Sequence, residues 1–247
     1  MIQIQNLHYQ YPDGTHALKE INLTIEKGEF LLVCGPNGSG KTTLIRLIGG
    51  LFKPTSGSIH VNGFDTSDHS KQVRGLIGMV FQDPDSQMVG ETVREDVAFG
   101  PENLDLSQNE IDTRVDWALR VMGLKDLSEK PCYLLSGGEK RRLALAGVLA
   151  MNPQVVLFDE PFSFLDYLGV QEVLKHMVHL HREGHTLLVA THDVEKVIAH
   201  VDRIAIIHQG ELKAIGPPEE LMSKLPQFGI RPPCYALLGK ERVSWLE

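Results

Sequence analysis

Residues 35–42 read GPNGSGKT, which matches the pattern G-x-x-x-x-G-K-[ST] in full. In a loop of this kind, glycines let the chain curl so that successive backbone N–H groups face the β- and γ-phosphates of a nucleotide. Lys41 adds a positive charge, and the Thr42 hydroxyl group can ligate Mg²⁺. The loop follows the apolar run FLLVC and precedes the helix-like run TTLIRLI, as such a site requires. The predicted phosphate site consists of Gly35, Pro36, Asn37, Gly38, Ser39, Gly40, Lys41, Thr42 and Thr43.

Two acidic residues follow an apolar run in VVLFDEP. Val155 to Phe158 predict a buried strand, and Asp159 stands at its carboxyl end, where ligands bind in open α/β sheets. We expect Asp159 to hold Mg²⁺ through water and Glu160 to polarise the attacking water as a general base. The alternative, a pair of solvated loop acids, is disfavoured because both residues lie between an apolar strand and Pro161.

His192 follows a second apolar run, TLLVAT. At the end of that predicted strand it could contact the γ-phosphate of the nucleotide. A single histidine is equally often structural, so both interpretations stay open from the residues alone.

Residues 135–142 read LSGGEKRR and contain no nucleophile–base pair and no cluster of metal ligands. Ser136 and Glu139 have the spacing of a capping box, which predicts the start of a helix. The cap does not explain Gly137 and Gly138, because glycine in a first turn costs backbone entropy unless something must approach the chain closely.

The elements that must position these residues follow from hydrophobic periodicity. Apolar residues alternate at Ile2 and Ile4 and again from Ile21 to Ile25, which predicts two strands, and the turn signals PDG and EKGE separate them from a third strand at Phe30–Cys34. A helix is expected after Lys41. Further short strands are predicted at residues 58–61 and 77–81.

The middle of the chain has a different character. From about Pro84 to Ala150 the period is helical, in EIDTRVDWALRVMGL and KRRLALAGVLA. After it, the runs at 155–158 and 186–190 flank a helix-like segment, which predicts parallel strands in an α/β sheet. RIAIIHQGELKAIG predicts a hairpin and PPEEL a helix. We therefore predict an α/β core at residues 1–83 and 151–225, a helical subdomain at 84–150 and a short tail at 226–247.

Composition limits the classes of function. The chain has 247 residues, 42% of them hydrophobic, and a net charge of −8, so it can bury a large core and is not built for broad attraction to nucleic acid. No apolar run approaches the length needed to span a bilayer, and the N-terminus does not resemble a signal peptide. Three scattered cysteines fit reduced thiols. We expect a cytosolic protein.

The motifs at 35–42, 135–142, 155–161 and His192 together resemble those of the ATP-binding cassette (ABC) ATPases, in the family's order. The resemblance implies a P-loop α/β fold of ABC type, with a mixed sheet core, an N-terminal antiparallel β part and an inserted helical subdomain. It also implies ATP as the nucleotide and Mg²⁺ as its metal. The signature motif LSGGQ reads LSGGE here, a departure that keeps the Ser-Gly-Gly core.

The same resemblance implies further roles. Tyr11 would stack on adenine, with Tyr9 as a rival, and Gln82 would sense Mg²⁺ and the attacking water. Ser136, Gly137 and Gly138 would contact the γ-phosphate of ATP held by a second cassette subunit, identical or paralogous. Asp166, in SFLD, would lie in the loop that crosses to that subunit, although Phe164 stands where a small residue is more usual.

A narrower resemblance points to one branch of the family. FQDPDSQMVGETVREDVAFGPENLDLS and the tail FGIRPPCYALL are similar to the ATPases of energy-coupling factor (ECF) transporters, especially the cobalt and nickel type. This implies a peripheral subunit on the cytoplasmic face of the membrane. Its partners would be a transmembrane coupling protein, seated in grooves formed partly by residues 82–100, and a substrate-binding membrane component. Within that stretch, core packing would explain most of Val89, Val93, Val97 and Phe99.

Three alternatives accompany this interpretation. The chain could serve an ECF vitamin importer, act as a soluble ABC ATPase on DNA or the ribosome, or bind ATP without turnover. The net charge of −8 and the absence of a coiled-coil insertion disfavour a soluble ATPase that acts on DNA or the ribosome. The intact Lys41, Asp159, Glu160 and His192 disfavour ATP binding without turnover.

A histidine-rich run, KHMVHLHREGH, offers a separate hypothesis. His176 and His179, and His181 and His185, have spacings that could chelate a transition metal on a helix. A solvated helix face is the favoured interpretation, because the cluster has no carboxylate or thiolate support.

Overall fold

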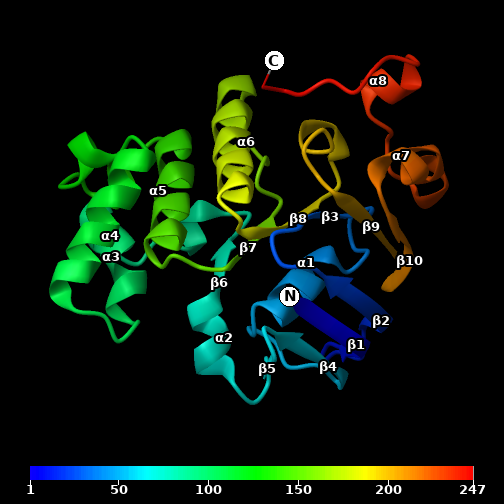
Figure 1. The fold of residues 1–247 in the computed structure, drawn as a ribbon, viewed down its shortest axis with the longest axis horizontal. Coiled ribbons are helices and arrows are strands. Elements are labelled where there is room, and N and C mark those ends of the chain that lie inside the picture. Colours follow the sequence, from blue (N-terminus) through cyan, green and yellow to red (C-terminus); the bar gives the residue numbers. More distant parts are fainter. Residues whose placement is uncertain (247) are drawn as a thin grey trace.

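Two β-sheets form the centre of the molecule, whose computed structural model describes residues 1–246 (Figure 1). The first sheet is antiparallel, with the order β2-β1-β4-β5. Its alternating apolar residues point to one side, so that Ile2, Ile4, Ile21, Leu23 and Ile25 are all buried. The antiparallel N-terminal part expected from the sequence is therefore confirmed. Its strands are β1 (Ile2–Gln10), β2 (His16–Ile25), β4 (Ser56–Val61) and β5 (Phe64–Asp65).

The second sheet has the order β10-β9-β3-β8-β7-β6 and is parallel except for β10. Every residue of β3 and β7 is buried, as expected for strands covered on both faces. Parallel pairing brings the carboxyl ends of β3, β7 and β8 to one edge, which confirms the predicted α/β sheet. The strands are β3 (Phe30–Cys34), β6 (Ile77–Val80), β7 (Val155–Asp159), β8 (Thr186–Thr191), β9 (Arg203–His208) and β10 (Glu211–Gly216).

Helices pack around the sheets and extend to one side (Figure 1). Helix α1 packs between the two sheets, and α3, α4 and α5 form a separate helical unit at the left of the view. The helices are α1 (Lys41–Ile48), α2 (Ser70–Leu76), α3 (Val93–Glu102), α4 (Gln108–Val121), α5 (Gly137–Ala150), α6 (Tyr167–Arg182), α7 (Pro218–Leu221) and α8 (Cys234–Leu237). Short 3₁₀ turns are η1 (Pro84–Ser86), η2 (Lys125–Leu127), η3 (Cys132–Leu134), η4 (Val194–Lys196) and η5 (Met222–Phe228). No helix within residues 1–246 is long and apolar enough to cross a membrane.

The two faces of the second sheet belong to two apolar cores. Along β3, Leu31 and Val33 face the antiparallel sheet and α1, whereas Leu32 faces the opposite side. On that opposite side the core continues without a break into the helical unit, through residues such as Val97 and Leu145. The division into an α/β core at 1–83 and 151–225 and a helical subdomain at 84–150 therefore remains a proposal. Of the predicted tail at 226–247, the last residue lies outside the described range.

The tail folds back over the molecule (Figure 1). Near its end, the Trp245 ring lies 5.6 Å from the Tyr167 ring at the start of α6, and the Trp245 carbonyl accepts a hydrogen bond from Gln171 at 2.7 Å. The end of the chain therefore contacts the first turns of α6, although Tyr167 and Leu168 remain exposed.

Candidate functional site

The predicted phosphate loop joins β3 to α1. A Cβ atom added to Gly35 would lie 2.1 Å from the carbonyl oxygen of Ile207, and one added to Gly40 would lie 2.7 Å from that of Ala17. Gly40 also has a φ of 109°, in the left-handed region that favours glycine. The neighbouring strands of this chain therefore require glycine at both positions.

Lys41 is folded back over this loop. Its Nζ donates to the carbonyl oxygens of Gly35 at 2.8 Å and Pro36 at 3.1 Å, and the side chain is buried. Burial lowers the pKa of Lys41, and the nearby Glu160 carboxylate, 3.9 Å away, opposes that shift. A buried ammonium group whose hydrogen bonds go only to backbone carbonyl oxygens is a suitable partner for a phosphate group.

Asp159 and Thr42 meet across the sheet edge. The Thr42 hydroxyl donates to Asp159 Oδ1 at 2.9 Å, and burial raises the pKa of the Asp159 carboxyl group. Hydroxyl and carboxylate oxygens are ligands that Mg²⁺ prefers, and a bound cation would stabilise the ionised form of this buried acid. The residues present therefore fit a magnesium site.

Glu160 and His192 come together from two different strands. The Glu160 N–H donates to the Ala190 carbonyl at 2.8 Å, in line with the parallel pairing of β7 and β8. Glu160 Oε1 accepts from the backbone N–H of His192 at 3.1 Å and lies 3.0 Å from its Nδ1. Glu160 has a φ of 46°, a strained backbone conformation of the kind found at functional sites. A carboxylate with an adjacent imidazole is an arrangement suited to proton transfer.

One cavity joins most of the predicted residues. It has a volume of about 540 Å³, and its walls include Tyr11, Lys41, Thr42, Gln82, Glu160 and His192. Tyr11 reaches it with its hydroxyl group 2.9 Å from Thr43 Oγ1. The rival Tyr9 instead stacks on Phe52, with ring centroids 5.3 Å apart. Of the two tyrosines, Tyr11 is thus placed to contact a ligand in this cavity.

Ser136, Gly137 and Gly138 do not line that cavity. Ser136 forms the predicted capping box: its Oγ accepts from the Glu139 N–H at 3.3 Å, and its own N–H donates to Glu139 Oε2 at 2.7 Å. That backbone donor lowers the pKa of Glu139. A Cβ atom added to Gly137 or Gly138 would meet no atom within 4 Å. Packing within residues 1–246 therefore does not require either glycine.

Asp166 is also absent from the cavity wall. It caps α6, and its Oδ1 accepts from the Gly169 N–H at 2.8 Å. Phe164, two residues earlier, is 96% exposed and has a φ of 61°. A non-glycine residue in a left-handed backbone conformation is strained, a feature often found at functional sites.

Two polar residues beside the site were missed in the sequence. Thr191 donates to Glu160 Oε2 at 2.8 Å, and Arg141 donates to the carbonyl oxygens of Phe81 and Gln82. The available signal for Arg141 was its spacing from Leu145 and Val148, which places it on the buried side of α5.

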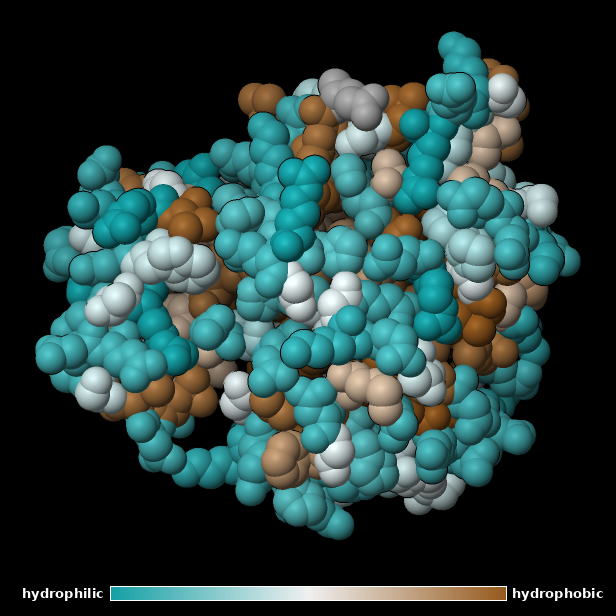
Figure 2. All heavy atoms as spheres, in the orientation of Figure 1, coloured by the Kyte–Doolittle hydropathy of each residue, from teal (hydrophilic) through white to brown (hydrophobic). Residues whose placement is uncertain are grey.

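The apolar side chains of residues 89–99, most of them in α3, fall into a buried and an exposed group. Val93 and Val97 are fully buried, whereas Val89 is 61% and Phe99 48% exposed, so core packing explains only two of the four. Phe99 lines a second cavity of about 690 Å³ with Leu104, Met151 and other residues of α2 and the helical unit. Figure 2 shows the corresponding notch between the helical unit and α2, with hydrophobic atoms on its wall.

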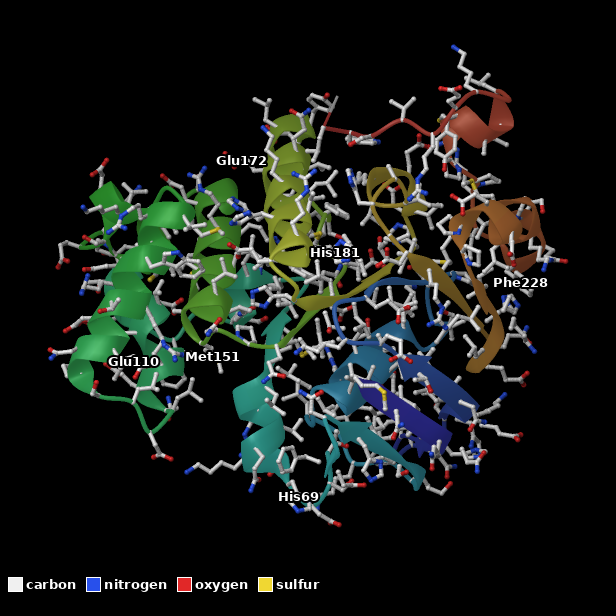
Figure 3. The ribbon with its side chains drawn as sticks, in the orientation of Figure 1. His69, Glu110, Met151, Glu172, His181 and Phe228 are labelled. Atoms are coloured by element: carbon white, nitrogen blue, oxygen red, sulfur yellow. The ribbon has the colours of Figure 1, made fainter. Side chains whose placement is uncertain are left out.

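Three of the four histidines in the run at residues 175–185 contact different partners. His179 is near Glu183, His181 bonds the Gly28 carbonyl at 3.0 Å, and His185 bonds the Pro153 carbonyl at 2.7 Å. Figure 3 labels His181 at the end of α6 that meets the sheet. Among the described residues no three His, Cys, Asp or Glu side chains gather as they would around a metal ion.

Comparisons with known proteins agree with the fold. The sequence model of a family described as ABC transporter matches residues 18–163. The chain is 40% identical over 226 residues to the energy-coupling factor transporter ATP-binding protein EcfA of Methanocaldococcus jannaschii, covering 90% of this chain and 81% of that protein. It is 45% identical over 237 residues to the EcfA of Methanosarcina acetivorans, covering 94% and 86%.

Two solved structures are similar over nearly their whole length. CbiO1 of Clostridium perfringens, part of the ABC transporter complex cbiONQ, has a TM-score of 0.81 and 39% identity, covering 96% of this chain and 98% of that one. A dimeric cassette, MJ0796 bound to ADP and Pi, has a TM-score of 0.79 and 31% identity, covering 88% and 98%. The predicted fold class is confirmed.

Proposed function

This chain belongs to the ABC transporter family and is an ATPase, and from that premise we propose that it drives an ECF-type importer of a transition-metal ion, cobalt or nickel. The observation that carries the proposal is the cavity in which Lys41, Glu160 and His192 meet at one sheet edge. The similarity to EcfA proteins and to CbiO1 supports the transporter class.

In the proposed reaction, ATP lies along the loop at 35–43 with its adenine against Tyr11. Lys41 would leave the carbonyl groups of the loop and bind the β- and γ-phosphates. Thr42, Gln82 and, through water, Asp159 would hold Mg²⁺, which neutralises phosphate charge when bound.

The chemical step would use the pair formed by Glu160 and His192. A water oxygen bonds to the γ-phosphorus, the bond to the bridging oxygen of ADP breaks, and the water proton passes to the Glu160 carboxylate. His192 is hydrogen-bonded to Glu160, and in the reaction it would donate to a γ-phosphate oxygen. Thr191 keeps the second Glu160 oxygen in place.

The active form would be a pair of cassettes. Ser136 to Gly138 do not line this chain's own cavity, and the open glycines would leave room for the γ-phosphate of ATP held by a second copy or a paralogue. Asp166, beside the exposed Phe164, would lie on the same contact. The dimeric state of the MJ0796 cassette supports this arrangement.

The membrane partner would dock on the notch beside Phe99. A half-exposed aromatic side chain beside Leu104 and Met151 gives an apolar surface, and Arg74 and the ion pair of Lys71 with Asp105 lie at its edge. A coupling protein with an apolar cytoplasmic helix would fit this surface, and the chain would then lie at the cytoplasmic face of the membrane.

The decisive test is Glu160→Gln. The variant should bind ATP and remain as a dimer on size-exclusion chromatography, with hydrolysis reduced about 10²-fold or more. Hydrolysis at the wild-type rate would remove Glu160 from the role of general base.

The transport class is tested separately. Expression with the membrane components encoded beside it should yield a detergent-stable complex, and Phe99→Glu should reduce recovery of that complex while ATP binding is unchanged. Uptake of Co²⁺ or Ni²⁺ by the complex supports the metal importer, uptake of a vitamin supports the alternative, and recovery only with ribosomes or DNA contradicts both.

A further inference from the structure

A single buried side chain connects the two halves of the nucleotide machinery. Arg141, on the second turn of α5, is 3% exposed and donates to the Phe81 carbonyl at 2.7 Å and to the Gln82 carbonyl at 2.8 Å. Gln82 belongs to the cavity that holds this chain's own nucleotide. The first turn of α5 begins with the exposed glycines that have no role in that cavity.

Neighbouring contacts stiffen the same connection. Lys140 pairs with Asp85 in η1, three residues after Gln82. The Gln87 side chain accepts from the Phe81 N–H at 3.1 Å and donates to the Met79 carbonyl at 3.1 Å, so the loop has internal bonds of its own. The loop from Phe81 to Gln87 is therefore a compact unit, attached to α5 by two adjacent basic residues.

The position of Arg141 is unfavourable for a guanidinium group. Burial lowers the pKa of Arg141, the negative charge of Asp83 opposes that shift, and the Arg141 Nε is buried without a hydrogen-bond partner among residues 1–246. Its two hydrogen bonds go to neutral carbonyl groups rather than to a carboxylate. A buried charge held in this way is costly, which favours a role beyond stabilising the helical unit.

We propose that Arg141 is a positioning residue that couples the two ATP sites of a cassette pair. Helix α5 is rigid, and Arg141 lies five residues from Ser136, about 7.5 Å along the helix axis. When the first turn of α5 engages the nucleotide of the opposite cassette, the guanidinium group moves with it and carries the Gln82 main chain. Binding at one site thereby sets Gln82 at the other. The inference rests on the proposed paired action of two cassettes.

The test compares Arg141→Met with a matched control in the Glu160→Gln background, which is expected to hold ATP between two cassettes. Arg114→Met is the control, because Arg114 also donates to a backbone carbonyl, that of Met151 at 3.1 Å, within the helical unit but away from Gln82. Amide hydrogen exchange is followed in peptides covering residues 79–92 and 135–145, with and without ATP.

ATP should slow exchange in both peptides for the parent and for Arg114→Met. In Arg141→Met, protection of 135–145 should persist while protection of 79–92 falls by at least about half. Equal protection of both peptides in Arg141→Met overturns the proposal. Absence of ATP-dependent protection at 135–145 in the parent would instead contradict the proposed cassette pair, so the two failures are distinguishable.

Kinetics in the chain with native Glu160 provide the second measurement. Arg141→Met should lower kcat about tenfold, leave KM within about twofold, and reduce the Hill coefficient for ATP toward one, whereas Arg141→Lys should recover part of kcat because an ammonium group can reach one carbonyl. If Arg141→Met does not fold, Arg141→Lys and Lys140→Met are judged by the same exchange criterion. Unchanged cooperativity in a folded variant also overturns the proposal.

Discussion

Two glycine-containing helix starts in this chain look alike in sequence and differ in their surroundings. At the loop before α1, the carbonyl groups of Ile207 and Ala17 leave no space for a Cβ atom on Gly35 or Gly40. At the start of α5, Gly137 and Gly138 face open space. The first set of glycines is required by the chain's own packing, and the second is not. The difference supports the proposal that the first start binds phosphate within one chain, whereas the second contributes to the nucleotide site of another chain.

The largest effect is expected at the first start. Lys41→Met removes the cation for the phosphates and should lower both ATP affinity and hydrolysis, the latter by about 10²–10³-fold. Isothermal titration with ATP and a phosphate-release assay measure the two quantities. Retained tight ATP binding would mean that the loop alone holds the phosphates.

Ser136→Arg tests the start of α5. It should lower hydrolysis about as much as Lys41→Met does, but without lowering ATP affinity. The bulky cation should block the approach of a second cassette, so hydrolysis falls about 10²-fold or more, while ATP binding at Lys41 changes little. Loss of the cap should cost about 1 kcal/mol of unfolding free energy. A matched loss of ATP binding and hydrolysis would place Ser136 in the chain's own site and end the distinction between the two starts.

Gly40→Ala tests packing directly. Its φ of 109° and the 2.7 Å approach to the Ala17 carbonyl should lower the free energy of unfolding by about 2–4 kcal/mol. Urea denaturation provides the measurement. Wild-type stability would mean that the loop relaxes around the new methyl group.

Gly137→Ala is the counterpart at the second start. Because the position is open, the methyl group should raise the unfolding free energy by up to about 1 kcal/mol through helix propensity. Hydrolysis should nevertheless fall about tenfold, since the γ-phosphate approaches the bare backbone there. Full activity in the stabilised variant would leave this glycine without a functional reason.

The smallest effect on stability concerns two acidic groups, one bonded to each helix start. Asp159 has a raised pKa from burial, so its ionised form opposes folding, and stability falls as pH rises through the folded pKa. Glu139 has a lowered pKa, so its contribution falls as pH decreases. Asp159→Asn should therefore be modestly more stable than the parent at pH 7 and nearly equal at pH 3, as measured by thermal melts, while hydrolysis is lost. If Asp159→Asn and the parent were equally stable at both pH values, burial would not raise the pKa of Asp159 as argued.

Local patterns determined much of this protein from the sequence. The phosphate loop, the strand before Asp159 and the capping box at Ser136 each depend on the backbone conformation of a few adjacent residues, and the spacing of residue types records that conformation. The parallel order of β7 and β8 followed from two apolar runs with a helix between them. The resemblance to ABC ATPases added the roles of Tyr11, Gln82 and Asp166, which remain to be tested.

Only the tertiary structure decided the remaining relationships. It placed Tyr11 but not Tyr9 at the cavity, and it buried Val93 and Val97 while leaving Val89 and Phe99 exposed. It also gave His181 and His185 different backbone partners. It also placed Arg141 on the Gln82 carbonyl, 59 residues away in sequence. Contacts of this kind depend on how rigid elements are oriented against one another, and hydrophobic periodicity records which face of an element is buried but not which distant atom that face will meet.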